Sequence, residues 1–279
     1  MTRQRILVFS GIGVVLLAGA ALGHRYYGEI EHALFGVEKV KGVETDDLYN
    51  AQNRLFKRGR RDKMEVCLTI DDGPHPQSLP LILDILKRYD AKATFFMVGK
   101  RIQQSPALVR KVLADGFEVG NHTQNHPRLD TLTPEQVHDE LAQCEENFEK
   151  ATGGTKMTLF RPPGMRFTPT VFKVVDEFGY TTVDWNYGAK DFVAKENGPM
   201  VSGGPQHIVD YVLKNVTAGG IILLHDSPET AEALPQILEG LKLKGFAVKD
   251  VSQMLADLPK PIFVRSNAGR LGKLAMKVH

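Results

Sequence analysis

Two short strings in the chain contain carboxylates and histidines at spacings that could support chemistry. The first is Thr69-Ile70-Asp71-Asp72-Gly73 and the second is His122-Thr123-Gln124-Asn125-His126. Two histidines four residues apart face the same side of a helical turn, and one carboxylate completes a set of three protein ligands, which leaves a catalytic metal one open position. The other carboxylate of the Asp pair is then available as a general base.

Each string also has a purely structural interpretation. An exposed Asp-Asp-Gly-Pro turn is common in loops, and a lone histidine is more often structural than a ligand. Burial of both Asp71 and Asp72, in contrast, requires a compensating cation because adjacent carboxylates repel. The presence of His122 and His126 at the end of a predicted strand, in the same chain as the Asp pair, favours the metal site.

The elements that must position these residues are predicted from residue 65 onward, where short apolar runs alternate with amphipathic stretches. Strands are predicted over Val66–Ile70, Ala93–Val98, Phe117–Gly120, Leu159–Arg161, Thr181–Trp185, Gly220–Leu224 and Phe246–Val248. Helices are predicted between them, over Leu79–Tyr89, Pro106–Ala114, Pro134–Ala151, Pro169–Phe178, Gln206–Val216 and Thr230–Lys242. Each polar motif follows the carboxyl end of a strand, the edge where (β/α) barrels build active sites. We therefore predict an α/β fold, a distorted or incomplete (β/α) barrel with about seven parallel strands, with an open doubly wound sheet as the alternative.

The N-terminus has a targeting signature. Arg3 and Arg5 precede an uncharged stretch of 18 residues from Ile6 to Gly23. We expect residues 1–23 to be a signal peptide or a membrane anchor, and the protein to be exported to the periplasmic or extracytoplasmic space. Ala18-Gly19-Ala20 is similar to a cleavage site, whereas the length is the minimum for a membrane span, so cleavage and anchoring both stay open.

Composition and charge divide the rest of the chain. The 279 residues are 42% hydrophobic and 24% charged, which is typical of one large domain with extensions. Basic residues prevail in a linker over 24–64 and in a tail over 259–279, and acidic residues prevail in the catalytic domain predicted over 65–258. The basic flanks could contact a membrane or an anionic wall polymer, or could be solvated. The export signal disfavours nucleic acid, and we expect a monomer. Cys67 and Cys144 are expected to be packing residues.

Both strings, together with the stretch A-T-F-F-M-V-G-K that begins at Ala93, resemble the first two motifs of the polysaccharide deacetylases of carbohydrate esterase family four. The resemblance covers roughly residues 65–255. It implies that Asp72, His122 and His126 bind the metal and that Asp71 is the catalytic base.

The third family motif is matched in part by Arg161-Pro162-Pro163-Gly164-Met165. The resemblance implies that Arg161 pairs with Asp71 and keeps it ionised. It also implies that the N–H of Gly164 stabilises the oxyanion, although the aromatic side chain usual at that position is missing. A rigid Pro-Pro loop held by an arginine salt bridge is the structural alternative.

The last two motifs follow further along the chain. Trp185 is followed by Asp191 and Phe192 at the family spacing, with Phe192 in place of a second Trp. The resemblance implies that Asp191 orients the acid histidine, with Asp184 as a rival, and Trp185 is either a core residue or an aromatic surface for a sugar.

In the string Ile222-Leu223-Leu224-His225-Asp226, the resemblance makes His225 the general acid and places Leu223 at the acetyl methyl group. We interpret Asp226 as a loop or helix-capping residue.

The chemistry implied by the resemblance is hydrolytic removal of acetyl groups from an N-acetylated glycan, with Zn²⁺ as the expected metal and Co²⁺, Ni²⁺ or Mn²⁺ as alternatives. The expected export points to N-acetylglucosamine of peptidoglycan. Chitin oligomers, exopolysaccharide and acetylxylan stay open as substrates. A small-molecule amidase and a non-catalytic glycan-binding protein of the cell wall are the rival functions.

Overall fold

The structure is a computed structural model that describes residues 49–50, 54–189, 193–194, 200–201 and 204–258. The predicted N-terminal segment 1–23, the predicted basic tail 259–279, and Asp191 and Phe192 lie outside these residues. Within the described ranges, none of the helices is long and apolar enough to cross a membrane.

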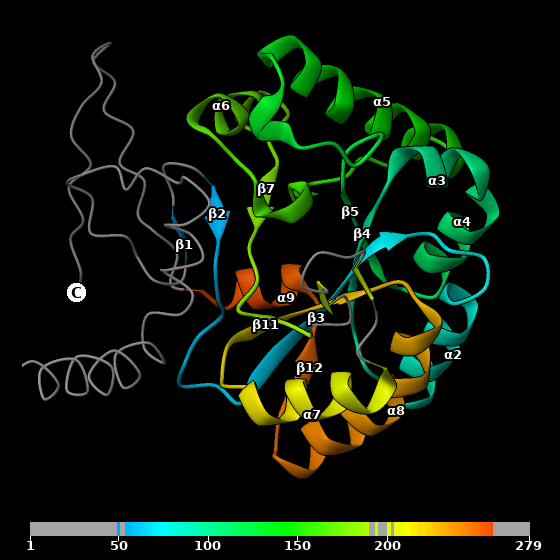
Figure 1. Cartoon of the computed structure of the whole chain (residues 1–279), viewed down its shortest axis with the longest axis vertical. Coiled ribbons are helices and arrows are strands. Elements are labelled where there is room, and N and C mark those ends of the chain that lie inside the picture. Colours follow the sequence, from blue (N-terminus) through cyan, green and yellow to red (C-terminus); the bar gives the residue numbers. More distant parts are fainter. Residues whose placement is uncertain (1–48, 51–53, 190–192, 195–199, 202–203, 259–279) are drawn as a thin grey trace, which may run out of the picture.

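A curled sheet of parallel strands forms the centre of the molecule (Figure 1). Its strands are β1 Tyr49–Asn50, β2 Leu55–Phe56, β3 Glu65–Gly73, β4 Thr94–Met97, β5 Glu118–Asn121, β6 Leu159–Phe160, β7 Thr181–Val183, β8 Tyr187–Gly188, β11 Gly220–His225 and β12 Ala247–Lys249. Their order is β1-β2-β7-β6-β5-β4-β3-β11-β8, and β12 also pairs with β3. All seven predicted strands are in this sheet. The prediction of an incomplete (β/α) barrel is therefore confirmed.

Every strand pair in this sheet is parallel except β1 with β2. The short strands β9 Val193–Ala194 and β10 Met200–Val201 form a separate antiparallel pair. Because the strands of the main sheet run the same way, their carboxyl ends meet at one edge, where loops from several strands can build a single site.

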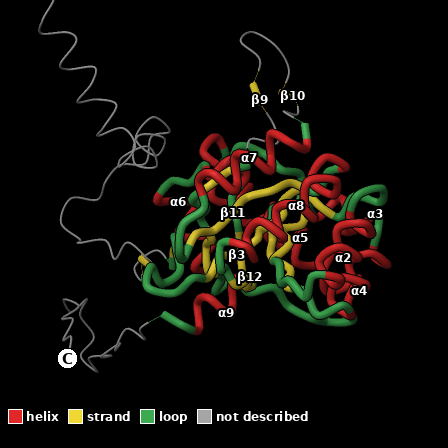
Figure 2. Tube along the Cα trace, turned by 90° about the horizontal axis from the view of Figure 1, so that it is seen from below, coloured by secondary structure: helices red, strands yellow, loops and turns green. Residues whose placement is uncertain are grey.

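Helices surround the strands (Figure 2). They are α2 Leu79–Arg88, α3 Gly99–Gln104, α4 Pro106–Ala114, α5 Pro134–Thr152, α6 Pro169–Glu177, α7 Pro205–Asn215, α8 Pro228–Leu243 and α9 Val251–Ala256, with the 3-10 turns η1 Leu129–Thr131 and η2 Pro163–Met165. The apolar positions of each helix lie on one face at helical spacing, as in the buried Leu79, Ile82, Leu83 and Leu86 of α2. This face packs on the sheet, and neighbouring helices such as α7 and α8 pack on each other.

Side-chain caps fix where the helices next to the site begin. Thr133 and Gln136 form a capping box at the start of α5, so the chain turns into a helix soon after the loop that follows β5. Ser227 caps α8 by accepting a hydrogen bond from the N–H of Thr230. The connection between β11 and α8 is therefore short, which holds the end of β11 in place.

Residues 54–64, which the sequence analysis assigned to the basic linker or N-terminal extension over 24–64, contact the domain. Leu55 and Phe56 of β2 are buried and pair with β7. Arg58 donates to the hydroxyl of Tyr187, and the N–H of Gly59 donates to the carbonyl of Gly219. A two-residue apolar segment among basic residues gives too short a pattern to indicate a strand.

Both cysteines pack in the interior, as the sequence predicted. Cys67 on β3 and Cys144 on α5 are buried and unpaired. Burial raises the pKa of each thiol well above its ordinary value. Neither thiol is therefore poised for nucleophilic or redox chemistry.

Candidate active site

Asp71 and Asp72 reach one site although they are neighbours on β3. Successive side chains of a regular strand point to opposite faces, so one of the two would normally point away. The pairing of β3 with β4 shifts register between Asp71 and Gly73, and Asp72 has a left-handed φ of 69°. The side chain of Arg101 donates to the main-chain oxygen of Asp72 and supports this conformation. The irregularity turns Asp72 toward the same loops as Asp71.

His122 and His126 lie in an irregular loop after β5, so the predicted helical turn is wrong. Thr123 and His126 have φ values of 66° and 60°, which a right-handed helix excludes. Side chains satisfy the backbone instead: Asn121 Oδ1 accepts from the N–H of Thr123 at 2.8 Å, and Thr123 Oγ1 accepts from the N–H of His126 at 3.0 Å. The two imidazole rings nevertheless meet, with ring centroids 5.0 Å apart.

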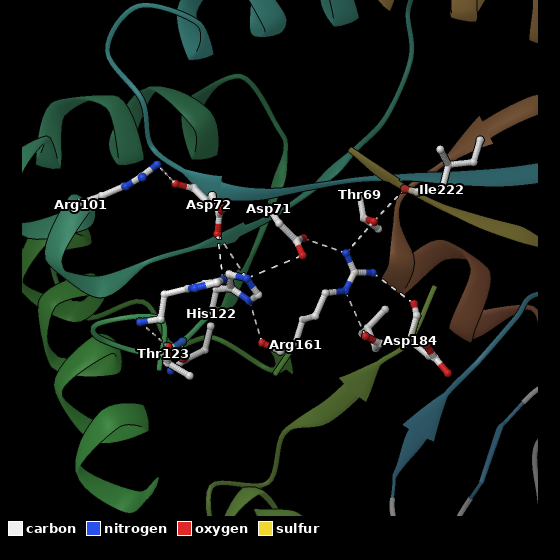
Figure 3. A network of polar contacts seen from close by, with 12 residues as sticks. Thr69, Asp71, Asp72, Arg101, His122, Thr123, Arg161, Asp184 and Ile222 are labelled. Atoms are coloured by element: carbon white, nitrogen blue, oxygen red, sulfur yellow. Dashed lines mark hydrogen bonds and ion pairs between the residues drawn. The ribbon is translucent and has the colours of Figure 1, made fainter. Parts of the chain in front are cut away.

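The predicted metal ligands are brought together (Figure 3). Asp72 Oδ1 lies 3.5 Å from His122 Nε2 and 3.3 Å from His126 Nε2. Ligand atoms bound at about 2.0–2.2 Å to a tetrahedral ion lie roughly 3.3–3.6 Å from one another. These separations, and the mixture of imidazole and carboxylate donors, fit a divalent metal such as Zn²⁺.

The hydrogen bonds around these side chains also fit a cation. His122 Nδ1 lies 2.7 Å from the main-chain oxygen of Arg161, which can only accept, so Nδ1 carries the hydrogen. In the neutral tautomer, the lone pair of His122 Nε2 then faces Asp72. Asp72 Oδ1 is buried and receives no hydrogen bond from the described residues. A cation between His122 Nε2 and Asp72 Oδ1 would satisfy both acceptors.

The protonation states of two proposed ligands, Asp72 and His126, favour metal binding. Burial opposes ionisation of Asp72, but the neighbouring His122, His126, His225 and Arg101 outweigh it and lower the pKa of the carboxyl below its usual value. Burial, together with His122, lowers the pKa of His126, although Asp72 and Asp71 act in the opposite direction. Near neutral pH, Asp72 is therefore ionised and His126 is neutral, which is the state of a ligand.

Asp71 is held outside the ligand group by a buried ion pair. Its Oδ1 accepts from Arg161 Nη1 at 2.8 Å, and the two side chains are 4% and 1% exposed. Its Oδ2 lies 3.7 Å from His122 Nε2. The structure thus pairs Arg161 with Asp71, as the resemblance implied.

Arg161 is itself fixed from several sides. Its guanidinium donates to Thr69 Oγ1 at 2.7 Å and to the main-chain oxygens of Val183 at 3.1 Å and Asp184 at 3.2 Å. It also lies over the ring of Phe96, 4.3 Å from the centroid. Arg161 therefore has one orientation, and that orientation sets the position of Asp71.

The predicted acid histidine is at the end of β11, next to β3. In the pairing of these strands His225 is opposite Asp71, and Leu223 is opposite Thr69. Leu223 and His225 are two residues apart on a strand and so share a face. Leu223 is almost entirely buried, at 9% exposure.

Asp226 does not cap α8, because Ser227 is the residue that caps this helix. Its buried carboxylate accepts from Ser78 Oγ at 2.5 Å and from the N–H of His75 at 2.8 Å. Its own N–H donates to the main-chain oxygen of Asp71 at 2.9 Å. Asp226 therefore ties the turn after Asp72 to the end of β11.

The remaining predicted residues are placed less centrally. Gly164 is exposed in η2 with φ 60°, and its N–H meets no acceptor in the described part of the chain. Trp185 is partly buried and packs against the core. Asp184 is the alternative to Asp191 as the partner of the acid histidine. Its side chain accepts from the N–H of Trp185 at 2.7 Å. Asp191 lies outside the described residues.

Thr69, Asn121 and Arg101 support the site but were not predicted to do so. Thr69 precedes Asp71 by two residues, so the strand period places both on one face, and this spacing could have revealed it. Asn121 could have been suspected as a polar residue inside a buried strand end. The sequence has no signal for the contact of Arg101, because that contact is made to a main-chain oxygen.

Comparisons with known proteins agree with this arrangement. The family described as polysaccharide deacetylase matches residues 58–183. The chain is 39% identical over 194 residues to the peptidoglycan-N-acetylglucosamine deacetylase of Bacillus cereus, which covers 68% of this chain and 87% of that protein. It is 32% identical over 248 residues to the peptidoglycan-N-acetylmuramic acid deacetylase PdaA of Bacillus subtilis, which covers 86% of this chain and 92% of that protein. Its structure is similar to that of a CE4 family pseudoenzyme from Bacillus anthracis, with a TM-score of 0.66 and 30% identity over 73% of this chain and 69% of that one.

Proposed function

The chain belongs to the polysaccharide deacetylase family, carbohydrate esterase family four, and we propose that it is a metal-dependent hydrolase that deacetylates N-acetylglucosamine residues of peptidoglycan. One observation carries the proposal. A second carboxylate, Asp71, is held by Arg161 beside the ligand group, so it is available for proton transfer.

Asp72, His122 and His126 would hold the metal, and Zn²⁺ suits their donor atoms and spacing. When bound there, a divalent metal supplies Lewis acidity, which polarises an acetyl carbonyl and makes water more acidic.

Asp71 acts as the general base. It takes a proton from the water whose oxygen attacks the acetyl carbon, and its ion pair with Arg161 holds it in place for this step. The N–H of Gly164 donates to the oxyanion as the carbonyl carbon becomes tetrahedral. Loss of one such donor costs about 3 kcal/mol of transition-state stabilisation in enzymes where it has been measured.

His225 acts as the general acid. It donates a proton to the sugar nitrogen as the carbon–nitrogen bond breaks, which releases the free amine and acetate. Asp191 orients and charges this imidazole, Leu223 packs against the acetyl methyl group, and Trp185 offers an aromatic surface to the sugar.

The choice of peptidoglycan rests on location and on the relatives. Residues 1–23 have the pattern of a signal peptide or anchor, so we propose that the catalytic domain is exported and faces the wall. Basic residues before and after the domain would keep it close to an anionic membrane or wall polymer. Two of the relatives described above are deacetylases of peptidoglycan sugars by name.

A non-catalytic glycan-binding function is the second candidate, because the similar protein from Bacillus anthracis is a pseudoenzyme. The fold alone therefore does not establish activity. The pairing of Asp71 with Arg161 and the intact Asp-His-His group support catalysis in this chain.

Acetate release from peptidoglycan, chitooligosaccharide and acetylxylan tests the proposal. Each substrate should be incubated with protein that has been stripped of metal, and with the same protein after addition of Zn²⁺. We expect release from peptidoglycan that depends on the added metal. Binding of glycan without acetate release by the metal-loaded protein would favour the non-catalytic function, and release from another substrate alone would reassign the glycan.

A further inference from the structure

A line of hydrogen-bonded side chains extends from α5 to residues 122–126, which carry two of the proposed metal ligands and are called the ligand loop below. The hydroxyl of Tyr180, just before β7, donates to Glu145 Oε2 of α5. Asn121 Nδ2 donates to the oxygen of Tyr180 at 3.3 Å, and Asn121 Oδ1 accepts from the N–H of Thr123 at 2.8 Å. Tyr180 and Asn121 thus connect Glu145 to the ligand loop.

The direction of each hydrogen bond in this line is fixed. Both oxygens of Glu145 accept, Oε2 from Tyr180 and Oε1 from the N–H of Met157 at 2.9 Å. Burial raises the pKa of Tyr180 well above its ordinary value, so the hydroxyl keeps the hydrogen that it donates. Its oxygen can therefore accept from Asn121, which also donates to the main-chain oxygen of Leu141 at 3.0 Å. With both of its amide hydrogens engaged, Asn121 directs its oxygen to the ligand loop.

The ligand loop depends on this oxygen because its backbone is strained. Thr123 is β-branched and has a φ of 66°, a left-handed conformation that such residues rarely adopt. The residue is fully buried, and its N–H has Asn121 Oδ1 as its acceptor. If this acceptor is held less firmly, the metal-free loop populates other conformations. The apparent dissociation constant for a metal then rises as the fraction of the binding conformation falls.

The ring of Tyr180 is held independently of its hydroxyl. The residue is 2% exposed, and its ring stacks on those of Phe160 and Phe178, with centroids 6.3 Å and 5.4 Å away. Phe160 is also the residue of β6 that pairs with Asn121 of β5. Aromatic packing therefore places the hydroxyl beside Asn121, and Tyr180→Phe removes the oxygen while it retains the ring.

We propose that Tyr180 and Glu145 are positioning residues, which act through Asn121 to hold the ligand loop in the conformation that binds metal. The inference rests on the proposed function, since it concerns the ligands of the same site. The effect is conformational and differs from that of a ligand. Loss of the Tyr180 hydroxyl lowers the affinity for metal, but a site that has been filled at high metal concentration keeps all its donor atoms.

The affinity of the full chain for Zn²⁺, measured by competition with a chelating dye at pH 7.5, tests this inference. The variants are Tyr180→Phe, Glu145→Gln, the double variant and Tyr89→Phe. Tyr89 is a matched control, because its hydroxyl likewise donates to a glutamate, Glu239 Oε1 at 2.7 Å, and this bond joins α2 to α8 at the exposed surface.

We expect Tyr180→Phe to raise the Kd for Zn²⁺ by about three- to tenfold, the scale of one lost hydrogen bond. Glu145→Gln should raise it as well, because an amide offers one oxygen where the carboxylate offers two. The double variant should resemble Tyr180→Phe, since both changes break the same line, and Tyr89→Phe should behave as wild type. At saturating Zn²⁺, Tyr180→Phe should regain the kcat of wild type for acetate release.

Two results would overturn the inference. One is a Tyr180→Phe protein that unfolds at lower urea concentration but binds Zn²⁺ as wild type does, because the hydroxyl would then contribute to stability alone. The other is an equal rise in Kd for Tyr89→Phe, which would make the effect a general consequence of a lost hydrogen bond.

Amide hydrogen exchange of the metal-free protein separates this inference from the proposed function. The N–H of Thr123 should exchange about three- to tenfold faster in Tyr180→Phe than in wild type, and Tyr89→Phe should leave its rate unchanged. If the wild-type protein binds no Zn²⁺, the metal-dependent function fails and the exchange rate still decides the inference. Equal exchange in wild type and Tyr180→Phe would show that the hydroxyl does not hold the ligand loop.

Discussion

Arg161 and Asp71 form an ion pair of 2.8 Å between Nη1 and Oδ1 that is almost completely removed from solvent. The same arginine residue accepts a hydrogen bond from His122 through its main-chain oxygen. One residue therefore holds the proposed base with its side chain and a proposed metal ligand with its backbone. The separate roles that we propose for Asp71 and Asp72 agree with this arrangement, because of these two carboxylates Asp71 is the one that pairs with the guanidinium.

Arg161→Met should destabilise the protein and abolish most of its activity. The substitution leaves Asp71 as a buried carboxylate without its cation, which costs about 3–5 kcal/mol in comparable pairs. Urea unfolding of the metal-free protein measures the loss. The double variant Asp71→Asn with Arg161→Met is the control and should be more stable than Arg161→Met alone. Equal instability of both variants would mean that the unpaired charge is not the cause.

Asp226→Ala should loosen the turn that carries Asp72. It leaves the Ser78 hydroxyl and the His75 N–H without their acceptor, and we expect a loss of about 2–3 kcal/mol in the free energy of unfolding. Ser78→Ala and the double variant complete a mutant cycle. A coupling energy near zero between Asp226 and Ser78 would show that their contact contributes nothing to stability.

The sequence predicted the architecture well because the apolar runs are long and the helices begin with strong signals. Pro106, Pro134 and Pro169 each mark the first residue of a helix in the structure. The strand β2 was not predicted, because two residues are too few to show the alternation of buried and exposed side chains that is typical of a strand. Its place beside β7 depends on tertiary packing.

The sequence predicted that Asp72, His122 and His126 lie together, but it did not predict the local geometry. The spacing of His122 and His126 suggested a helix, yet hydrogen bonds from Asn121 and Thr123 side chains select a loop that also brings the rings together. The register shift that turns Asp72 toward Asp71 depends on the pairing of β3 with β4, which local sequence does not reveal.

Metal affinity should fall in acid. A proton and a metal compete for the lone pair of His126, and the pKa of this residue is below its ordinary value of 6.5. The dissociation constant for Zn²⁺ should therefore rise as the pH drops below about 6.5, because a protonated imidazole is no ligand. Competition with a chelating dye at pH 7.5, 6.5 and 5.0 would measure this trend. Affinity that is constant down to pH 5 would contradict the assignment of His126 as a ligand.

Asn121→Ala should weaken metal binding without removal of a ligand. Asn121 is fully buried, and its amide also donates to the main-chain oxygen of Leu141 at 3.0 Å. Loss of such a supporting contact typically weakens metal affinity by about 10–100-fold. Asn125→Ala is the matched control, since Asn125 lies in the same loop and bonds to Glu140 at the exposed surface. Similar effects of the two substitutions would refute a special role for Asn121.

The account depends most on the division of labour between the two adjacent carboxylates. Asp71→Asn and Asp72→Asn should be purified in parallel, loaded with Zn²⁺, and examined for bound metal and for acetate release from peptidoglycan. We predict that Asp71→Asn retains one metal per chain but loses nearly all turnover, whereas Asp72→Asn loses both. An Asp71→Asn protein that keeps its metal and most of its activity would contradict the account.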